Sequence, residues 1–187
     1  MSIYSAVCRR LLGPGIVALA LLPLTAQAQW REVSEADAAL ILIGGIANSV
    51  STKDFWVGRM EHNDAYVTRY GNREGELPRA VLVYYKIDDG YAVTDKQDLK
   101  EDLQGRQFEY LVGRQIDFGR HGTTTIQRRP ADYIAFRTDA AACVFYQQYI
   151  GGDEPQEQFV AYVCKAQQSS LTTADIDAIA GRMLFKR

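Results

Sequence analysis

The chain has 187 residues, of which 47% are hydrophobic and 24% charged, and this composition suits a folded protein with a full core. Its formal net charge at pH 7 is −2, from 21 basic and 23 acidic side chains. A weakly acidic chain is a poor match for nucleic acid or anionic membrane surfaces, so we expect no nucleic-acid partner.

Residues 1–28 have the features of a secretory signal peptide. Two arginines precede an apolar run, and Ala26 and Ala28 occupy the two positions that a signal peptidase reads. A membrane anchor needs about 20 apolar residues, whereas this run is shorter and contains glycine and proline. We therefore expect cleavage after Ala28 and a periplasmic or secreted chain without a membrane span. The paired arginines leave twin-arginine export open, although the Leu-rich run favours general secretion.

The remaining residues, 29–187, have a length typical of a single globular domain. They number 159 and carry 19 basic and 23 acidic side chains, a net charge of −4. Two of the three cysteines, Cys143 and Cys164, lie in this part of the chain. In an oxidising compartment two cysteines are far more often bridged than free, so we predict a disulfide between them.

The first predicted element is a helix over residues 35–48. Ser34 can cap it, acidic residues follow in the first turn, and apolar residues recur at helical spacing. Gly44 and Gly45 weaken this prediction by about 1 kcal/mol each relative to alanine. The alternative is a buried strand over residues 38–43, which read AALILI.

Alternating aromatic and aliphatic residues then predict a hairpin of two strands, 55–60 and 65–70. His62 lies in its polar turn, but a zinc site needs three or four ligands, so we interpret it as a solvated turn residue. Residues 80–87 form the strongest predicted strand and are apolar on both faces at their start, which indicates a central position in a sheet.

The middle of the chain predicts a short strand over 91–93 and a helix from Thr94 to about Gln104. This segment is acidic, but its spacing lacks the pattern of a calcium loop. Further strands are predicted over 108–112, 115–118, 123–129 and 133–137, with a tight turn at 119–122.

The segment from Cys143 to Cys164 predicts a long hairpin with a polar tip. Pairing Ile150 with Glu157 places the two cysteines opposite each other and matches aromatic and aliphatic partners on both faces. After it, Thr172 and Asp175 form a capping-box pattern, and an apolar stripe that includes Met183 and Leu184 predicts an amphipathic helix.

Together these elements predict an α+β fold. We expect an antiparallel β-meander of about six to eight strands, packed by an N-terminal helix and a C-terminal amphipathic helix, with one disulfide-closed hairpin.

The sequence lacks the usual motifs of catalysis. There is no G-x-S-x-G, no H-E-x-x-H, no C-x-x-C and no P-loop, so we expect no metal and no cofactor. Paired carboxylates for glycoside cleavage leave no sequence signature, and a small hydrolase using Asp or Glu stays open. An inhibitor of a secreted enzyme is a third alternative.

The leading hypothesis is a non-catalytic protein that binds a protein partner or an envelope component. Arginines concentrate between residues 106 and 137, and arginine is enriched at binding surfaces. A cationic site for a carboxylate or phosphate is predicted near residues 119–122. The candidate ligand-binding residues are Arg114, Arg120, His121, Arg128 and Arg137. The alternative is that these arginines have no binding role and line the solvated face of a sheet.

Overall fold

The computed structural model describes residues 29–60, 62–71, 79–93, 98–104, 108, 111, 114–166 and 170–186. The predicted signal peptide, residues 1–28, lies outside the described residues. No helix in the described part of the chain is long and apolar enough to cross a membrane.

The described elements are mostly strands, with three short helices. In chain order they are β1 (Gln29–Glu32), β2 (Leu40–Leu42), α1 (Ile46–Ser49), β3 (Thr52–Arg59), β4 (Asn63–Gly71), β5 (Ala80–Ile87), α2 (Leu99–Leu103), β6 (Asp117–Ile126), β7 (Arg129–Arg137), β8 (Ala141–Ile150), β9 (Glu157–Ala166), α3 (Thr173–Ala180) and β10 (Met183–Phe185).

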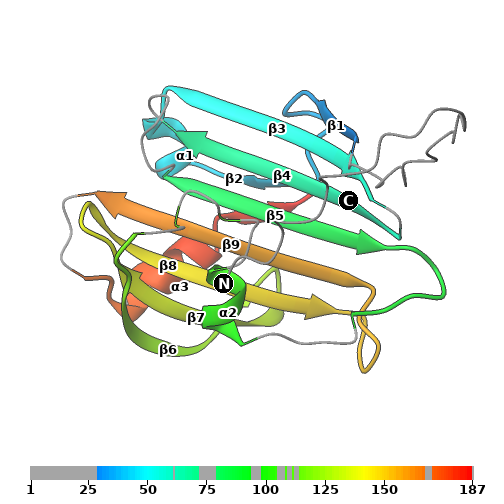
Figure 1. Cartoon of the computed structure of the whole chain (residues 1–187). Coiled ribbons are helices and arrows are strands. Elements are labelled where there is room, and N and C mark those ends of the chain that lie inside the picture. The colour runs from blue at the N-terminus through cyan, green and yellow to red at the C-terminus, as the bar shows by residue number, and fades with distance from the viewer. Residues whose placement is uncertain are drawn as a thin grey trace, which may run out of the picture.

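Eight of these strands form one antiparallel sheet, in the order β1-β3-β4-β5-β9-β8-β7-β6 (Figure 1). The predicted meander is correct within β3 to β5 and within β6 to β9. It is interrupted between them, because the chain passes from β5 to the far edge of the sheet and returns strand by strand until β9 pairs with β5. The predicted strand 80–87 is confirmed as β5, in the centre of the sheet.

Both faces of the sheet are covered. On one face α3, β2 and β10 pack on a cluster that includes Leu82, Tyr146 and Ala161. On the other face Leu103, at the end of α2, packs on a cluster that includes Val83. Figure 1 shows α2 in front of the sheet and α3 behind it. The predicted packing of a C-terminal helix on the sheet is therefore confirmed.

The disulfide hairpin has the predicted register. Strands β8 and β9 pair Ile150 with Glu157 and Cys143 with Cys164, and the two cysteines form a disulfide. Both cysteines are buried, in the cluster on the α2 face of the sheet. The alternation of large side chains on both strands specified the register, because a slip of one residue would exchange the two faces.

The predicted helix over 35–48 is wrong. Residues 35–37 form a turn, Leu40–Leu42 form strand β2, and only Ile46–Ser49 are helical. The strand interpretation of the apolar run is the correct one, because β2 pairs with β10. Side chains of β4 also bind the β2 backbone: the Tyr70 hydroxyl accepts a hydrogen bond from Leu42 N at 2.9 Å, and Thr68 Oγ1 donates to the Leu40 carbonyl at 2.8 Å.

The C-terminal helix is shorter than predicted. The capping box is confirmed, since Thr172 and Asp175 bind each other's backbone N–H groups. The helix α3 ends at Ala180, however, and Met183 and Leu184 belong to strand β10 rather than to the helical stripe. Gly181 follows α3 directly, and the chain then turns to pair with β2.

The predicted turn at 119–122 is wrong, because β6 runs through it. The pairing of β6 with β7 shifts register between Phe118 and His121, but the strand continues. The chain reverses at Gln127 and Arg128 instead. Gly122 fits a strand because the Tyr133 ring lies over it, and an added Cβ would be 3.0 Å from the Tyr133 hydroxyl oxygen. The glycine allows close packing there, not a reversal of the chain.

Three smaller predictions also need correction. Residues 91–93 are not a strand. The helix predicted to begin at Thr94 is seen as α2, with Asp98 as its cap, while Thr94 lies outside the described residues. Of the strand predicted over 108–112, the described residues Phe108 and Leu111 have 3₁₀ geometry and are buried.

Removing the disulfide should weaken the protein without unfolding it. The bridge closes a loop with a sequence separation of 21, so replacing Cys143 and Cys164 by alanine should lower the free energy of unfolding by about 3 kcal/mol. Denaturant unfolding of the two proteins measures the difference. Labelling of both native cysteines by iodoacetamide without reduction would contradict the bridge.

The β6–β7 turn offers a gain in stability. Gln127 and Arg128 have φ angles of 48° and 68°, in the left-handed region that glycine and asparagine tolerate best. The double substitution Gln127→Asn and Arg128→Gly should therefore raise the free energy of unfolding by about 1 kcal/mol. Arg128→Ala is the control, because it removes the same charge without relieving the backbone. If the double variant is no more stable than Arg128→Ala, relief of backbone strain at the turn is not the cause of the gain.

Candidate functional site

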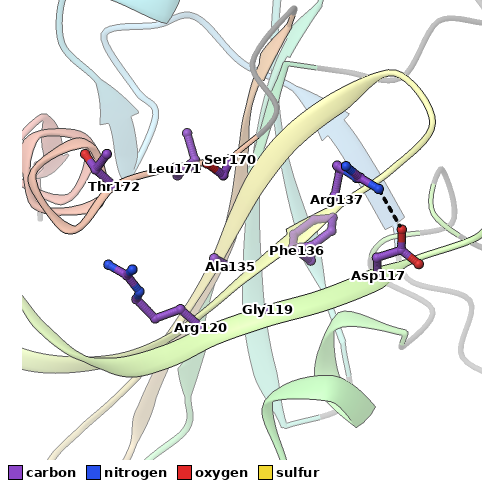
Figure 2. Close-up of a pocket in the computed structure, with 9 residues that line it drawn as sticks. All are labelled: Asp117, Gly119, Arg120, Ala135, Phe136, Arg137, Ser170, Leu171 and Thr172. Atoms are coloured by element: carbon purple, nitrogen blue, oxygen red, sulfur yellow. Dashed lines mark hydrogen bonds and ion pairs between the residues drawn. The ribbon is translucent and has the colours of Figure 1, made fainter.

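A pocket of about 410 Å³ opens between β6, β7 and the segment that leads into α3 (Figure 2). Arginines stand on two sides of it, and Ala135 contributes apolar surface. Its described lining consists of Asp117, Gly119, Arg120, Ala135, Phe136, Arg137, Ser170, Leu171 and Thr172.

The β6–β7 register places the charged side chains at this pocket. Asp117 pairs directly with Arg137, so both side chains lie on one face of the sheet. The irregularity after Phe118 shifts the alternation, and Arg120 reaches the same side, where its Nη1 donates to Thr173 Oγ1 at 2.6 Å. Without the shift, Arg120 would alternate with Asp117 onto the opposite face.

The helix α3 holds the other wall of the pocket in place. Thr124 Oγ1 donates to Asp177 Oδ1 at 2.7 Å and thereby ties β6 to α3. The Tyr146 hydroxyl, buried beneath the helix, donates to the Ile176 carbonyl at 2.7 Å, and burial raises the pKa of this hydroxyl above its usual range. The sheet and the helix are thus joined at two places, through β6 and through β8.

The two arginines differ in their partners. Arg137 forms an ion pair with Asp117 at 3.3 Å, and the two side chains are 56% and 55% exposed. Arg120 forms no ion pair with any residue that the structure describes and is held by the Thr173 hydroxyl. An exposed pair in water contributes about 0–1 kcal/mol, so a ligand anion can compete with Asp117 for Arg137.

The first turn of α3 is already satisfied by the protein itself. The Asp175 carboxylate accepts hydrogen bonds from Lys165 Nζ at 2.6 Å and from the Thr172 hydroxyl and backbone N–H. The Lys165 ammonium, and secondly these Thr172 groups, hold the pKa of the Asp175 carboxyl well below its usual range. The positive character of the pocket therefore comes from its arginines and not from an open helix end.

Of the five predicted ligand-binding residues, the structure brings Arg120 and Arg137 together. His121 follows Arg120 on β6 but lies opposite Ile134, on the α2 face of the sheet. Arg128 is exposed in the turn after β6.

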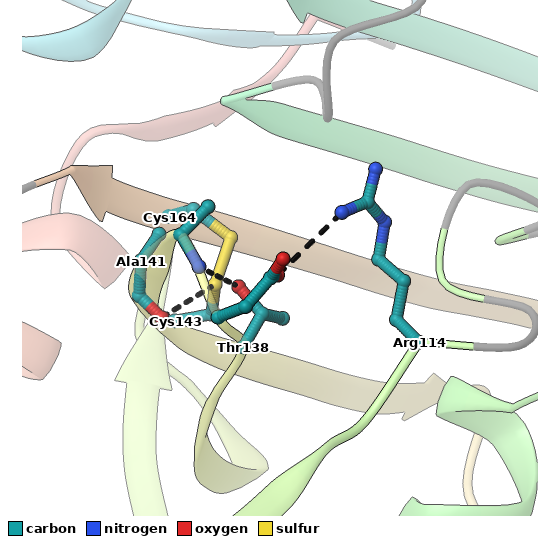
Figure 3. The surroundings of a disulfide bond; sticks show 7 residues. Arg114, Thr138, Ala141, Cys143 and Cys164 are labelled. Carbon is teal, nitrogen blue, oxygen red and sulfur yellow. Dashed lines mark hydrogen bonds and ion pairs between the residues drawn. A yellow bond between two sulfur atoms is a disulfide. The ribbon is translucent and has the colours of Figure 1, made fainter.

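Arg114 is also separated from the pocket. It forms an ion pair with Asp139 at 3.6 Å near the disulfide (Figure 3). It belongs to the segment whose Leu111 and Ile116 pack on the α2 face of the sheet.

Sequence reasoning missed the rest of the lining. Asp117 becomes a neighbour of Arg137 only through the β6–β7 register, and Ser170 and Leu171 join the pocket through the docking of α3. The capping-box pattern at Thr172 was visible in the sequence, but nothing local connected it with residues 117–137.

A second polar cluster lies on the α2 face, at the middle of the sheet. Asp102 is 3% exposed, and its Oδ2 accepts hydrogen bonds from the side-chain amides of Gln147 and Gln158, the latter at 3.1 Å. Burial, and secondly the Asp102 charge, raises the pKa of the Tyr85 hydroxyl to about 12. These bonds satisfy buried polar groups and fasten α2 to β8 and β9.

Comparison with known proteins gives no family assignment. No family model, curated protein or solved structure matches the chain. In the described ranges, no group of three or more His, Cys, Asp or Glu side chains is arranged to hold a metal ion. Inferences about function therefore depend on the arginine pocket itself.

Asp175 should make stability depend on pH. A carboxyl with a lowered pKa in the folded state stabilises fully above its unfolded pKa of about 3.9, and this contribution is lost as the pH falls below that value. Asp175→Asn should therefore lower Tm at pH 7, and the difference from the wild type should shrink toward pH 2. Asp153→Asn, in the exposed β8–β9 loop, is the control. A Tm difference that stays constant with pH would contradict the role of this carboxylate.

Proposed function

We propose that the protein is a non-catalytic, periplasmic or secreted binding protein that holds a carboxylate or phosphate group of its partner in the arginine pocket. The observation that carries this proposal is the placement of Arg120 and Arg137 on two sides of a cavity of about 410 Å³. The partner is a protein or an envelope component that bears such a group.

The chemistry of guanidinium supports an anionic ligand. Arginine presents a planar set of N–H donors that matches the oxygens of carboxylate and phosphate, often with two parallel hydrogen bonds. The Ser170 hydroxyl at the rim adds a donor, and Ala135 supplies apolar surface for the carbon atoms next to the anion. A cavity of this size holds one acidic side chain or one phosphate group with its neighbours.

A carboxylate hydrolase is less well supported by this pocket. Glycoside cleavage uses two carboxyl groups on opposite sides of the scissile bond. Among the described lining residues Asp117 is the one acid, and it is paired with Arg137. No observation favours the inhibitor alternative.

Substitution of the two pocket arginines tests the proposal. Arg120→Gln with Arg137→Gln should abolish retention of the protein on phosphocellulose, and retention of the wild type should weaken above about 0.15 M salt because screening increases. The Tm should change by a few degrees at most, since the Arg137 ion pair is exposed.

A second double variant separates the pocket from net charge. Arg114→Gln with Arg128→Gln removes the same two charges from outside the pocket and should leave retention close to that of the wild type. If both double variants lose retention equally, retention depends on the overall charge of the protein and not on the pocket. Full retention of the Arg120 and Arg137 double variant would reject the pocket as the binding site.

A further inference from the structure

The outer edge of β6 has the properties of a docking edge for another strand. β6 has ten residues and is the last strand in the order of the sheet, so in the described part of the chain only one of its sides is paired. An edge strand presents a row of N–H and C=O groups that another chain can bind. The arginine pocket lies at the start of this edge, where Asp117, Gly119 and Arg120 line it.

The hairpin geometry identifies the outward-facing groups. In a two-residue turn the flanking pair, here Ile126 and Arg129, exchanges hydrogen bonds. The next pair, Thr125 with Pro130, is then a pair without such bonds, which agrees with the missing N–H of proline. By alternation, the backbone N–H and C=O groups of Thr123 and Thr125 point away from β7, toward the open edge.

The side chains of this edge do little to block pairing. Natural edges are protected by lysine, by proline, by short strands or by bulges. The irregularity between Phe118 and His121 protects the first part of β6, but residues 121–126 form a regular strand that contains neither lysine nor proline. Three threonines, which favour strand geometry, occupy positions 123–125.

The charge of the hairpin selects the kind of strand that fits. Residues 117–137 contain four arginines and two aspartates, a net charge of +2, in a chain whose net charge is −2. An acidic segment is therefore attracted to this edge, and a basic one is repelled. The pocket between Arg120 and Arg137 supplies a place for one of its carboxylates.

We propose that the partner is a polypeptide that adds an extended acidic segment to the outer edge of β6 and seats a carboxylate between Arg120 and Arg137. Main-chain hydrogen bonds to Thr123 and Thr125 hold the segment, and the pocket selects the acidic side chain. This proposal rests on the proposed function of the pocket and names the class of its partner.

Backbone-methylated peptides test the strand addition directly. The probe is a fluorescent decapeptide with six alternating threonine and valine residues flanked by two glutamates at each end. Two further versions carry N-methyl groups at every odd or every even residue of the central six. Because an added strand turns only alternate N–H groups toward its neighbour, one methylated version should bind like the parent peptide and the other at least about tenfold more weakly.

Substitutions in β6 test the same edge from the protein side. Thr125→Pro removes an outward N–H while leaving the bonds to β7, and it should weaken binding of the parent peptide about tenfold or more. Thr125→Val retains the N–H and should bind like the wild type. Thr123→Pro provides the same test if Thr125→Pro lowers Tm strongly, and anisotropy titration measures each affinity.

The outcomes separate this proposal from that of the anion pocket. Equal binding of both methylated peptides, or no binding of the parent peptide up to about 1 mM, overturns strand addition. If phosphocellulose retention still depends on Arg120 and Arg137, the pocket stands and serves a non-peptide anion such as that of an envelope glycan. If the peptide binds the Arg120 and Arg137 double variant as tightly as the wild type, the anchoring of its carboxylate in the pocket is wrong.

Discussion

The ladder between β5 and β9 is the interaction on which the rest of the fold depends. It joins two sets of antiparallel strands that are each local in sequence, pairing Ala80 with Val163 and Lys86 with Glu157. Alternate residues of these two central strands supply both buried clusters, with Leu82 facing α3 and Val83 facing α2. Because the two strands are far apart in the sequence, forming this ladder carries a large cost in chain entropy. Burial on both faces of the sheet offsets that cost.

The sequence predicted local structure well where both partners of an interaction were close in the chain. The register from Cys143 to Cys164 followed from two strands that a short loop connects, and a run that is apolar on both faces located β5. The helix predicted over 35–48 failed for the opposite reason. Its apolar run is a strand only because β10, at the other end of the described chain, pairs with it. Met183 and Leu184, which fit a helical stripe, are strand residues for the same reason.

The candidate site shows the same division between local and distant information. Composition indicated that arginines between residues 106 and 137 were candidates, but it did not indicate which of them share a face. That depends on the irregularity after Phe118, which turns Arg120 toward α3, and on the β6–β7 register, which places Arg137 beside Asp117. The two glycines in residues 119–122 suggested a turn, but the strand continues through them. Gly122 is there because the Tyr133 ring packs too closely for a larger residue.

The pairing of β2 with β10 makes the order of synthesis matter. Residues 40–42 obtain their strand partner only from residues 183–185, and the Lys186 ammonium then binds the Glu35 carbonyl at 2.6 Å. Until that C-terminal stretch has been made, Leu40 and Leu42 lack the neighbour that completes their side of the core. An emerging chain therefore cannot close this core before β10 is available. Such a delay would keep this side of the core open until residues 183–185 have been synthesised.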